Sequence, residues 1–214
     1  MYPWLARLGK VLQEEYNFTV ERRLMHTRSP PQNQAFRYLS NFVDAQDDPQ
    51  TLLIVYYVGH GYGSARGTGH LALSGKPIYD METKIAVSVE WHEVERTLVS
   101  ISSDVLVIFD CCQAGLLCRS AQDGLVTEGR VFQYLGACES EQQTKSSGRH
   151  SFTSAVIWAL KELVDESSFP VTRLVKKIEE HTDFPNDQQR PVLFGGRFDP
   201  VSVNICLARM PVPV

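Results

Sequence analysis

Two stretches of the chain are apolar almost without interruption, and a chemically reactive side chain follows each of them. Residues 52–58 read LLIVYYV and precede His60, whereas residues 104–110 read DVLVIFD and precede Cys111 and Cys112. Short runs of branched and aromatic residues are typical of strands buried on both faces of a parallel sheet. Because α/β sheets place their chemistry at the carboxyl ends of parallel strands, the pattern predicts that an imidazole and a thiol meet at one sheet edge.

The remaining apolar positions predict further helices and strands around these two. Helical spacing predicts helices at residues 3–16, 35–43, 90–98, 152–163 and 171–178. Shorter apolar stretches predict strands at residues 18–24, 131–137, 192–194 and 201–207. This alternation indicates a mainly parallel sheet enclosed by helices.

Polar and glycine-containing segments separate these elements. Residues 59–75 contain six glycines but no phosphate-binding signature, so we interpret them as a mobile loop beside the active site. Residues 77–89 are interpreted as irregular or as a small hairpin. The polar segments 116–130 and 139–150 are predicted to be loops, and the first of them is a candidate for cleavage.

Composition narrows the range of partners and compartments. The formal net charge of −4, without a cluster of Lys or Arg, gives no indication of nucleic acid or an anionic membrane as a partner. The longest apolar run is too short to span a bilayer, and no secretory signal pattern opens the chain. The five cysteines are odd in number, and two are adjacent, which argues against a disulfide framework. We therefore expect one domain, residues 1–214, in the reducing cytoplasm.

Three motifs resemble those of a known family. The segment YVGHG at 57–61 resembles the Y-S-G-H-G histidine motif of caspases and metacaspases, and DCCQAG at 110–115 resembles the metacaspase D-S-C-H-S-G motif. Cys112 lies 52 positions after His60, which is close to the caspase separation of about 50. The segments GACE at 136–139 and GRHSFT at 148–153 resemble the metacaspase S-A-C and G-A-F-T segments. The chain is therefore similar to cysteine peptidases of the caspase and metacaspase superfamily, most of all the fungal caspase-like type.

This resemblance implies a three-layer αβα sandwich and a cysteine endopeptidase with a His-Cys dyad. Aligned with the motif, the nucleophile is Cys112 and its partner is His60, and the amides of Gly59 and Cys112 form the oxyanion hole. Since side chains alternate along an extended segment, Cys111 should face away from Cys112 and behave as a small buried hydrophobe. Calcium is a candidate cofactor in this family, but no compact acidic cluster is found. A zinc site made by His60, His70 and Cys112 lacks ligand spacing.

Specificity is expected to favour Arg or Lys at P1. Caspases that cut after Asp carry a glutamine two residues before the nucleophile, and here that position is Asp110. A carboxylate facing the pocket pairs with a basic side chain and repels an acidic one. Glu139 and Glu141, after the third central strand, are further candidates for substrate binding. With such specificity, Arg119 and Arg130 become candidate self-cleavage points.

The chain departs from the family pattern at its beginning. Caspase-like domains start with a central strand and, in metacaspases, a G-C-x-x-D segment, whereas here the first predicted element is a helix. Either the sequence is a fragment of a longer polypeptide or the protein has lost that strand. The second case keeps open an inactive caspase-like scaffold as an alternative to a peptidase with a role in regulated cell death or self-processing. An unrelated thiol acyltransferase or hydrolase is a third alternative. We expect protein or peptide substrates, and the oligomeric state is left open.

Overall fold

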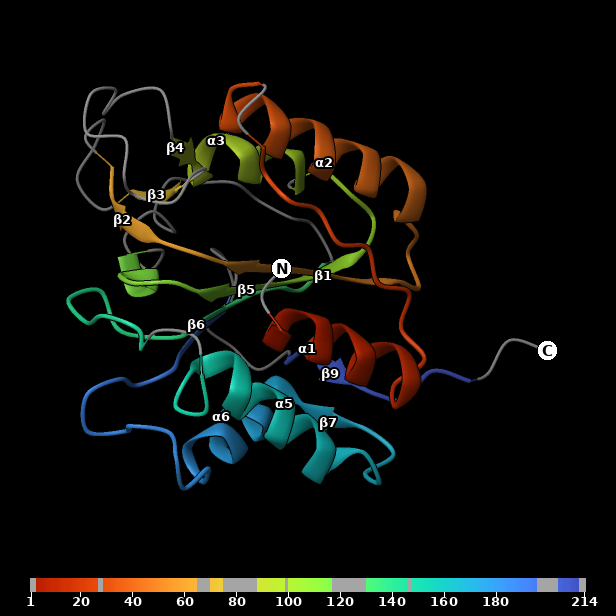
Figure 1. Ribbon diagram of the computed structural model, residues 1–214. Coiled ribbons are helices and arrows are strands. Elements are labelled where there is room, and N and C mark those ends of the chain that lie inside the picture. Colours follow the sequence, from red (N-terminus) through yellow and green to blue (C-terminus); the bar gives the residue numbers. More distant parts are fainter. Residues whose placement is uncertain are drawn as a thin grey trace.

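A four-stranded sheet between two layers of helices forms the centre of the computed structural model, in the strand order β1-β5-β6-β8 (Figure 1). Strands β1, β5 and β6 are parallel, and β8 runs antiparallel to β6. The predicted α/β sandwich with a mainly parallel sheet is therefore confirmed. The strands are β1 (Leu52–Val58), β5 (Asp104–Asp110), β6 (Phe132–Gly136) and β8 (Val192–Gly195). The structure describes residues 3–26, 29–64, 70–74, 88–98, 100–116, 130–145, 148–195 and 204–211.

Helices cover both faces of this sheet (Figure 1). One layer contains α2 (Pro31–Gln46), α3 (Trp91–Val94) and the 3₁₀ helix η1 (Glu95–Leu98). The other layer contains α1 (Pro3–Glu14), α5 (Phe152–Leu163) and α6 (Val171–Glu179). Alternate side chains of β5 enter the two cores: Val107 and Phe109 pack with the α2 side, whereas Leu106 and Ile108 pack with α1, α5 and α6. Strand β5 is thus buried on both faces, as its apolar run predicts.

Two smaller sheets complete the described fold. One is antiparallel, in the order β2-β3-β4, and lies beyond the carboxyl end of β1 (Figure 1). Its strands are β2 (Gly61–Gly63), β3 (Leu71–Ser74) and β4 (Ser88–Glu90). The second pairs β7 (Phe169–Pro170) with β9 (Cys206–Leu207). The glycine-containing segment 59–75 is therefore not wholly a loop, because β2 pairs with β3, whose Leu71, Ala72 and Leu73 are buried.

Two predicted strands differ from the structure. Residues 18–24 form no strand: the chain leaves α1 through Asn17, with φ 58°, and Arg22 donates to the Ala6 carbonyl at 3.2 Å. This segment therefore bonds to α1 instead of a neighbouring strand, and a strand requires such a neighbour. In residues 201–207 the described strand is only β9, which pairs outside the central sheet.

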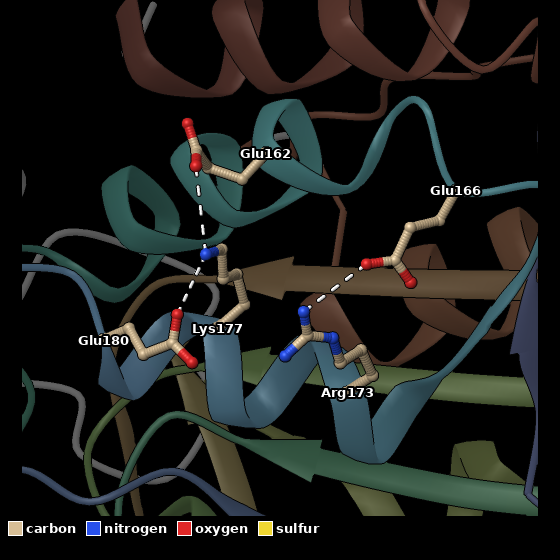
Figure 2. Close-up of polar contacts among 5 residues, drawn as sticks. All are labelled: Glu162, Glu166, Arg173, Lys177 and Glu180. Carbon is tan, nitrogen blue, oxygen red and sulfur yellow. Dashed lines mark hydrogen bonds and ion pairs between the residues drawn. The ribbon is translucent and has the colours of Figure 1, made fainter.

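Helices α5 and α6 pack side by side and carry ion pairs at their surface (Figure 2). Lys177 lies 2.9 Å from Glu180 and 3.8 Å from Glu162, and Arg173 lies 3.5 Å from Glu166. Exposed pairs of this kind contribute little, so the packing depends mainly on the buried apolar faces of the two helices. Among the described residues, no helix combines the length and apolarity that a membrane span requires.

Candidate active site

His60 and Cys112 occupy equivalent positions at the ends of neighbouring strands. The last paired residues of β1 and β5 are Val58 and Asp110, and each candidate lies two residues further along its strand. Because the two strands are parallel and in this register, the two segments leave the sheet at the same edge and on adjacent paths. The structure therefore brings the predicted histidine and cysteine segments together.

The backbone of His60 is held by its neighbours, while its side chain is exposed. The His60 carbonyl accepts a hydrogen bond from the Ser74 amide at 2.9 Å. The Tyr57 hydroxyl lies 3.0 Å from the same carbonyl and 3.1 Å from the carbonyl of Ser74, so it can donate to either. These bonds join the end of β1 to the β2-β3 hairpin and hold the backbone of His60 at the sheet edge.

The two adjacent cysteines have different surroundings. Cys111 is fully buried in the core cluster on the α2 side, whereas Cys112 is half-buried. Burial raises the pKa of the Cys111 thiol well above its usual value and raises that of Cys138 to about 11. Neither buried thiol ionises readily near neutral pH, so Cys112 is the cysteine suited to nucleophilic attack. This placement agrees with the expected alternation of the strand.

The segment after β6 encloses the cysteine loop. The Gly115 amide donates to the Cys138 carbonyl at 3.0 Å, and the Gln113 amide donates to the Gln142 carbonyl at 3.2 Å. On this side the Thr144 hydroxyl oxygen lies 3.6 Å from the Cys112 sulfur. Cys112 is therefore flanked by the β1 end on one side and by the segment after β6 on the other.

The predicted oxyanion role of Gly59 needs correction. Its amide donates to the Asp110 carbonyl at 3.2 Å and so forms the last bond between β1 and β5. The hydrogen bonds of the hairpin join His60 to Ser74 and Ser64 to His70, so the Gly61 and Gly63 amides point away from β3. The Gly63 amide donates to Gln113 Oε1 at 2.7 Å, which indicates that the Gly61 amide also points toward the cysteine loop.

Asp110 is buried and holds the start of α5. Its Oδ2 atom accepts hydrogen bonds from the Thr153 hydroxyl at 2.5 Å and the Thr153 amide at 3.2 Å. The Tyr56 hydroxyl lies 3.0 Å from the same threonine hydroxyl. Burial raises the pKa of the Asp110 carboxyl, although the bonds from Thr153 oppose this shift. The side chain thus lies on the α5 side of the sheet, opposite Cys111, and Oδ1 takes no part in these bonds.

The other candidate residues lie in the turn after β6, just before β6, or outside the described residues. Glu139 and Glu141 are exposed in the turn after β6. Arg130 lies just before β6, and its guanidinium donates a hydrogen bond to the Pro49 carbonyl at 3.1 Å. Arg119 lies outside the described residues. Within the part of the chain that the structure describes, no three or more His, Cys, Asp or Glu side chains form a group that could hold a metal.

The fold is a three-layer α/β sandwich, and two of its adjacent parallel strands lead directly to a histidine and a cysteine. These two features identify an α/β-sandwich protein with a candidate His-Cys site. The family model described as Caspase domain matches residues 5–195, and the chain belongs to this family. No curated protein matches the chain.

Solved structures show the same fold. Protein GSU0716 from Geobacter sulfurreducens is 14% identical, with a TM-score of 0.60 over 90% of this chain and 83% of its own. Caspase-1 from Spodoptera frugiperda is 15% identical, with a TM-score of 0.59 over 89% of this chain and 76% of its own. At these identities the likeness concerns the fold.

Sequence reasoning missed three residues at this site: Gly61 as the amide directed at the cysteine loop, Gln113, and Thr144. Gln113 adopts a positive φ of 57° immediately after Cys112, and its side chain reaches β2. The motif contains Gly61 directly after the histidine, and this position is a signal that sequence reasoning could have used. Thr144 lies in a polar segment without periodicity, which offered no signal.

Proposed function

We propose that this protein is a cysteine endopeptidase in which Cys112 is the nucleophile and His60 transfers the proton. The observation that carries this proposal is the equal offset of the two residues from the last pair of β1 and β5. It is supported by membership of the caspase-domain family and by the burial of Cys111 and Cys138. Protein or peptide chains are the substrates that this family implies.

The reaction proceeds by acyl transfer. His60 takes the Cys112 thiol proton, and the sulfur attacks the scissile carbonyl carbon to form a tetrahedral intermediate. The amides of Gly61 and Cys112 donate to its oxyanion, a contribution that generally amounts to several kcal/mol. The C–N bond then breaks as His60 returns the proton to the leaving amine. Water hydrolyses the thioester with His60 as base, which releases the acid and restores the thiol.

Cleavage after Arg or Lys is part of the same proposal. Asp110 precedes the nucleophile by two residues, and only 7% of it is exposed. An ionised carboxylate in such surroundings is unfavourable on its own, and a basic P1 side chain that reaches Oδ1 would compensate for this cost. Glu139 and Glu141 are exposed, so solvent and salt screen their contribution.

A catalytically inactive caspase-like scaffold is the second candidate. The exposed imidazole of His60, whose segment is held through backbone hydrogen bonds, favours it. A cytoplasmic location accompanies the peptidase proposal and is supported by the free thiols of Cys111, Cys112, Cys138 and Cys206. A role in regulated cell death or self-processing is part of the same proposal. Cell fractionation tests the location.

Labelling with peptide electrophiles separates the candidates. Acyloxymethyl ketones with Arg, Lys or Asp at P1 and otherwise identical peptides are incubated with the protein, with and without calcium, and adducts are located by mass spectrometry. The proposal expects a Cys112 adduct that forms fastest with the basic peptides. Absence of labelling supports the scaffold, and faster labelling by the Asp peptide contradicts the specificity.

A further inference from the structure

Thr144 contacts the sulfur of Cys112 from the segment that follows β6. Its hydroxyl oxygen lies 3.6 Å from Cys112 Sγ, within the range of hydrogen bonds to the large sulfur atom. A threonine hydroxyl can both donate and accept, so this contact can serve either the thiol or the thiolate. The acyl-transfer steps described above assign no role to Thr144.

Buried hydrogen bonds fix the position of this hydroxyl. The next residue, Lys145, donates its amide to Gln189 Oε1 at 3.0 Å, and Gln189 Nε2 donates to the Ala137 carbonyl at 3.0 Å. Gln189 is fully buried, and its bond to the Ala137 carbonyl is shielded from water, whereas its bond to the Lys145 amide is partly buried. The segment bearing Thr144 is thereby tied to the end of β6, and the hydroxyl is held beside the sulfur before any substrate arrives.

The sheet order places Thr144 and His60 on opposite flanks of Cys112. His60 follows β1 and Thr144 follows β6, while Cys112 follows β5 between them. A thiol is far more acidic than an aliphatic hydroxyl. When the pair loses a proton, the sulfur therefore becomes the anion and the hydroxyl becomes the donor.

We infer that Thr144 is a catalytic residue that donates a hydrogen bond to the Cys112 thiolate while His60 carries the proton. This inference rests on the proposed function, in which Cys112 is the nucleophile. A hydrogen bond to the charged form of a group favours that form. Removal of the hydroxyl should therefore make the thiol harder to ionise, without removing either the nucleophile or the base.

The pH profile of thiol alkylation tests this role without a peptide substrate. Iodoacetamide reacts with wild-type protein, Thr144→Val, Thr144→Ser and the exposed control Thr182→Val between pH 5 and 10, and tandem mass spectrometry distinguishes Cys112 from Cys111. Hydrogen bonds to charged groups contribute about 1.5–3 kcal/mol. Because Cys112 is only half-buried, we expect the low end of this range, which corresponds to a rise of about one pH unit in the Thr144→Val midpoint. Below the midpoint, alkylation should be about tenfold slower. Thr144→Ser and Thr182→Val should follow the wild-type profile.

Other outcomes overturn the inference. An unchanged or lower midpoint in Thr144→Val excludes thiolate stabilisation, and an equal rise in Thr144→Ser attributes the effect to side-chain packing. If Thr144→Val does not fold by circular dichroism, Thr144→Ala replaces it, with the same expected rise. A peptidase that depends on Cys112 but shows no shift in Thr144→Val contradicts this inference alone. If the proposed function itself is wrong, the peptide electrophiles should not label Cys112.

Discussion

Gly61 lies against Cys112 so closely that a Cβ atom at residue 61 would overlap the Cys112 carbonyl oxygen. The same atom would lie 2.6 Å from Cys111 Sγ, well inside normal contact distance. Backbone and buried sulfur leave little room for adjustment, so only glycine permits this approach. The distance between the histidine segment and the cysteine loop thus depends on the absence of a side chain.

The substitution Gly61→Ala should therefore displace His60 relative to Cys112. Misplacement by about 1 Å can reduce the rate about 10²-fold, and we expect a loss of this size in kcat/KM. Gly63→Ala is the matched control, because its Cβ would lie 3.7 Å from Leu116 and 3.8 Å from Gln113. Hydrolysis of a fluorogenic peptide with P1 Arg measures both variants. Equal activity in the two alanine variants would contradict the argument.

The two adjacent cysteines should respond differently to substitution. Cys112→Ala removes the nucleophile and should abolish peptide cleavage without loss of the fold. Cys111→Ser places a hydroxyl in an apolar cluster, which should lower the free energy of unfolding by about 1–3 kcal/mol while the folded protein retains activity. Denaturant unfolding and peptide hydrolysis measure the two effects. If Cys112→Ala is active and Cys111→Ser is inactive, the nucleophile is Cys111 and not Cys112.

The sequence predicted the parts of this molecule that depend on local pattern. The apolar runs identified β1 and β5. Strand β5 is buried on both faces, as predicted, whereas β1 is the edge strand of the sheet and most of its residues are only half-buried. The alternation of β5 also predicted that Cys111 faces the core, as its burial confirms. Neither result required knowledge of distant residues.

Features that depend on distant partners could not be predicted in this way. Residues 18–24 have a strand-like composition but bond to α1 and not to a strand. The motif marked both glycines beside His60, yet only the strand register shows that the Gly59 amide belongs to the sheet. Thr144 reaches Cys112 because Gln189, 45 residues further along the chain, holds its segment.

Self-processing should spare the bond after Arg130. The Arg130 guanidinium donates to the Pro49 carbonyl, and Val131 donates its amide to Asp104 Oδ1 at 2.9 Å. The Val131 carbonyl accepts from Val105 at 2.9 Å, so the residue after this bond is already tied to β5. Cleavage requires an accessible backbone, and we therefore expect any nick after Arg119.

Incubation of the purified protein, followed by mass spectrometry of the fragments, tests this prediction. Arg119→Ala should remain intact, whereas Arg130→Ala should be processed like wild type. A new amino terminus at Val131 would contradict the protection that the sheet provides. The Cys112→Ala variant serves as the control for contaminating proteases.

Asp110 should make stability depend on pH in the direction opposite to that of most carboxylates. Burial raises its pKa in the folded state, despite the bonds from Thr153. The pKa of Asp in an unfolded chain is about 4. Between this value and the raised pKa of folded Asp110, the folded protein binds more protons than the unfolded chain. The contribution of Asp110 to stability therefore falls as pH rises through this window, and above it the buried charge is a net cost.

The variant Asp110→Asn removes this charge, while its amide oxygen can still accept from Thr153. At pH 8 we expect its unfolding midpoint to exceed that of wild type by about 2–4 °C, equivalent to about 1 kcal/mol for a protein of this size. The difference should shrink as pH falls toward 4, because wild-type Asp110 then becomes neutral as well. Thermal unfolding followed by circular dichroism at several pH values measures the difference, in which other titrating groups cancel.

The same variant should lose its preference for P1 Arg, since the neutral amide cannot pair with a guanidinium. A lower midpoint at pH 8 together with an unchanged preference for Arg would show that Asp110 supports the fold and not the specificity.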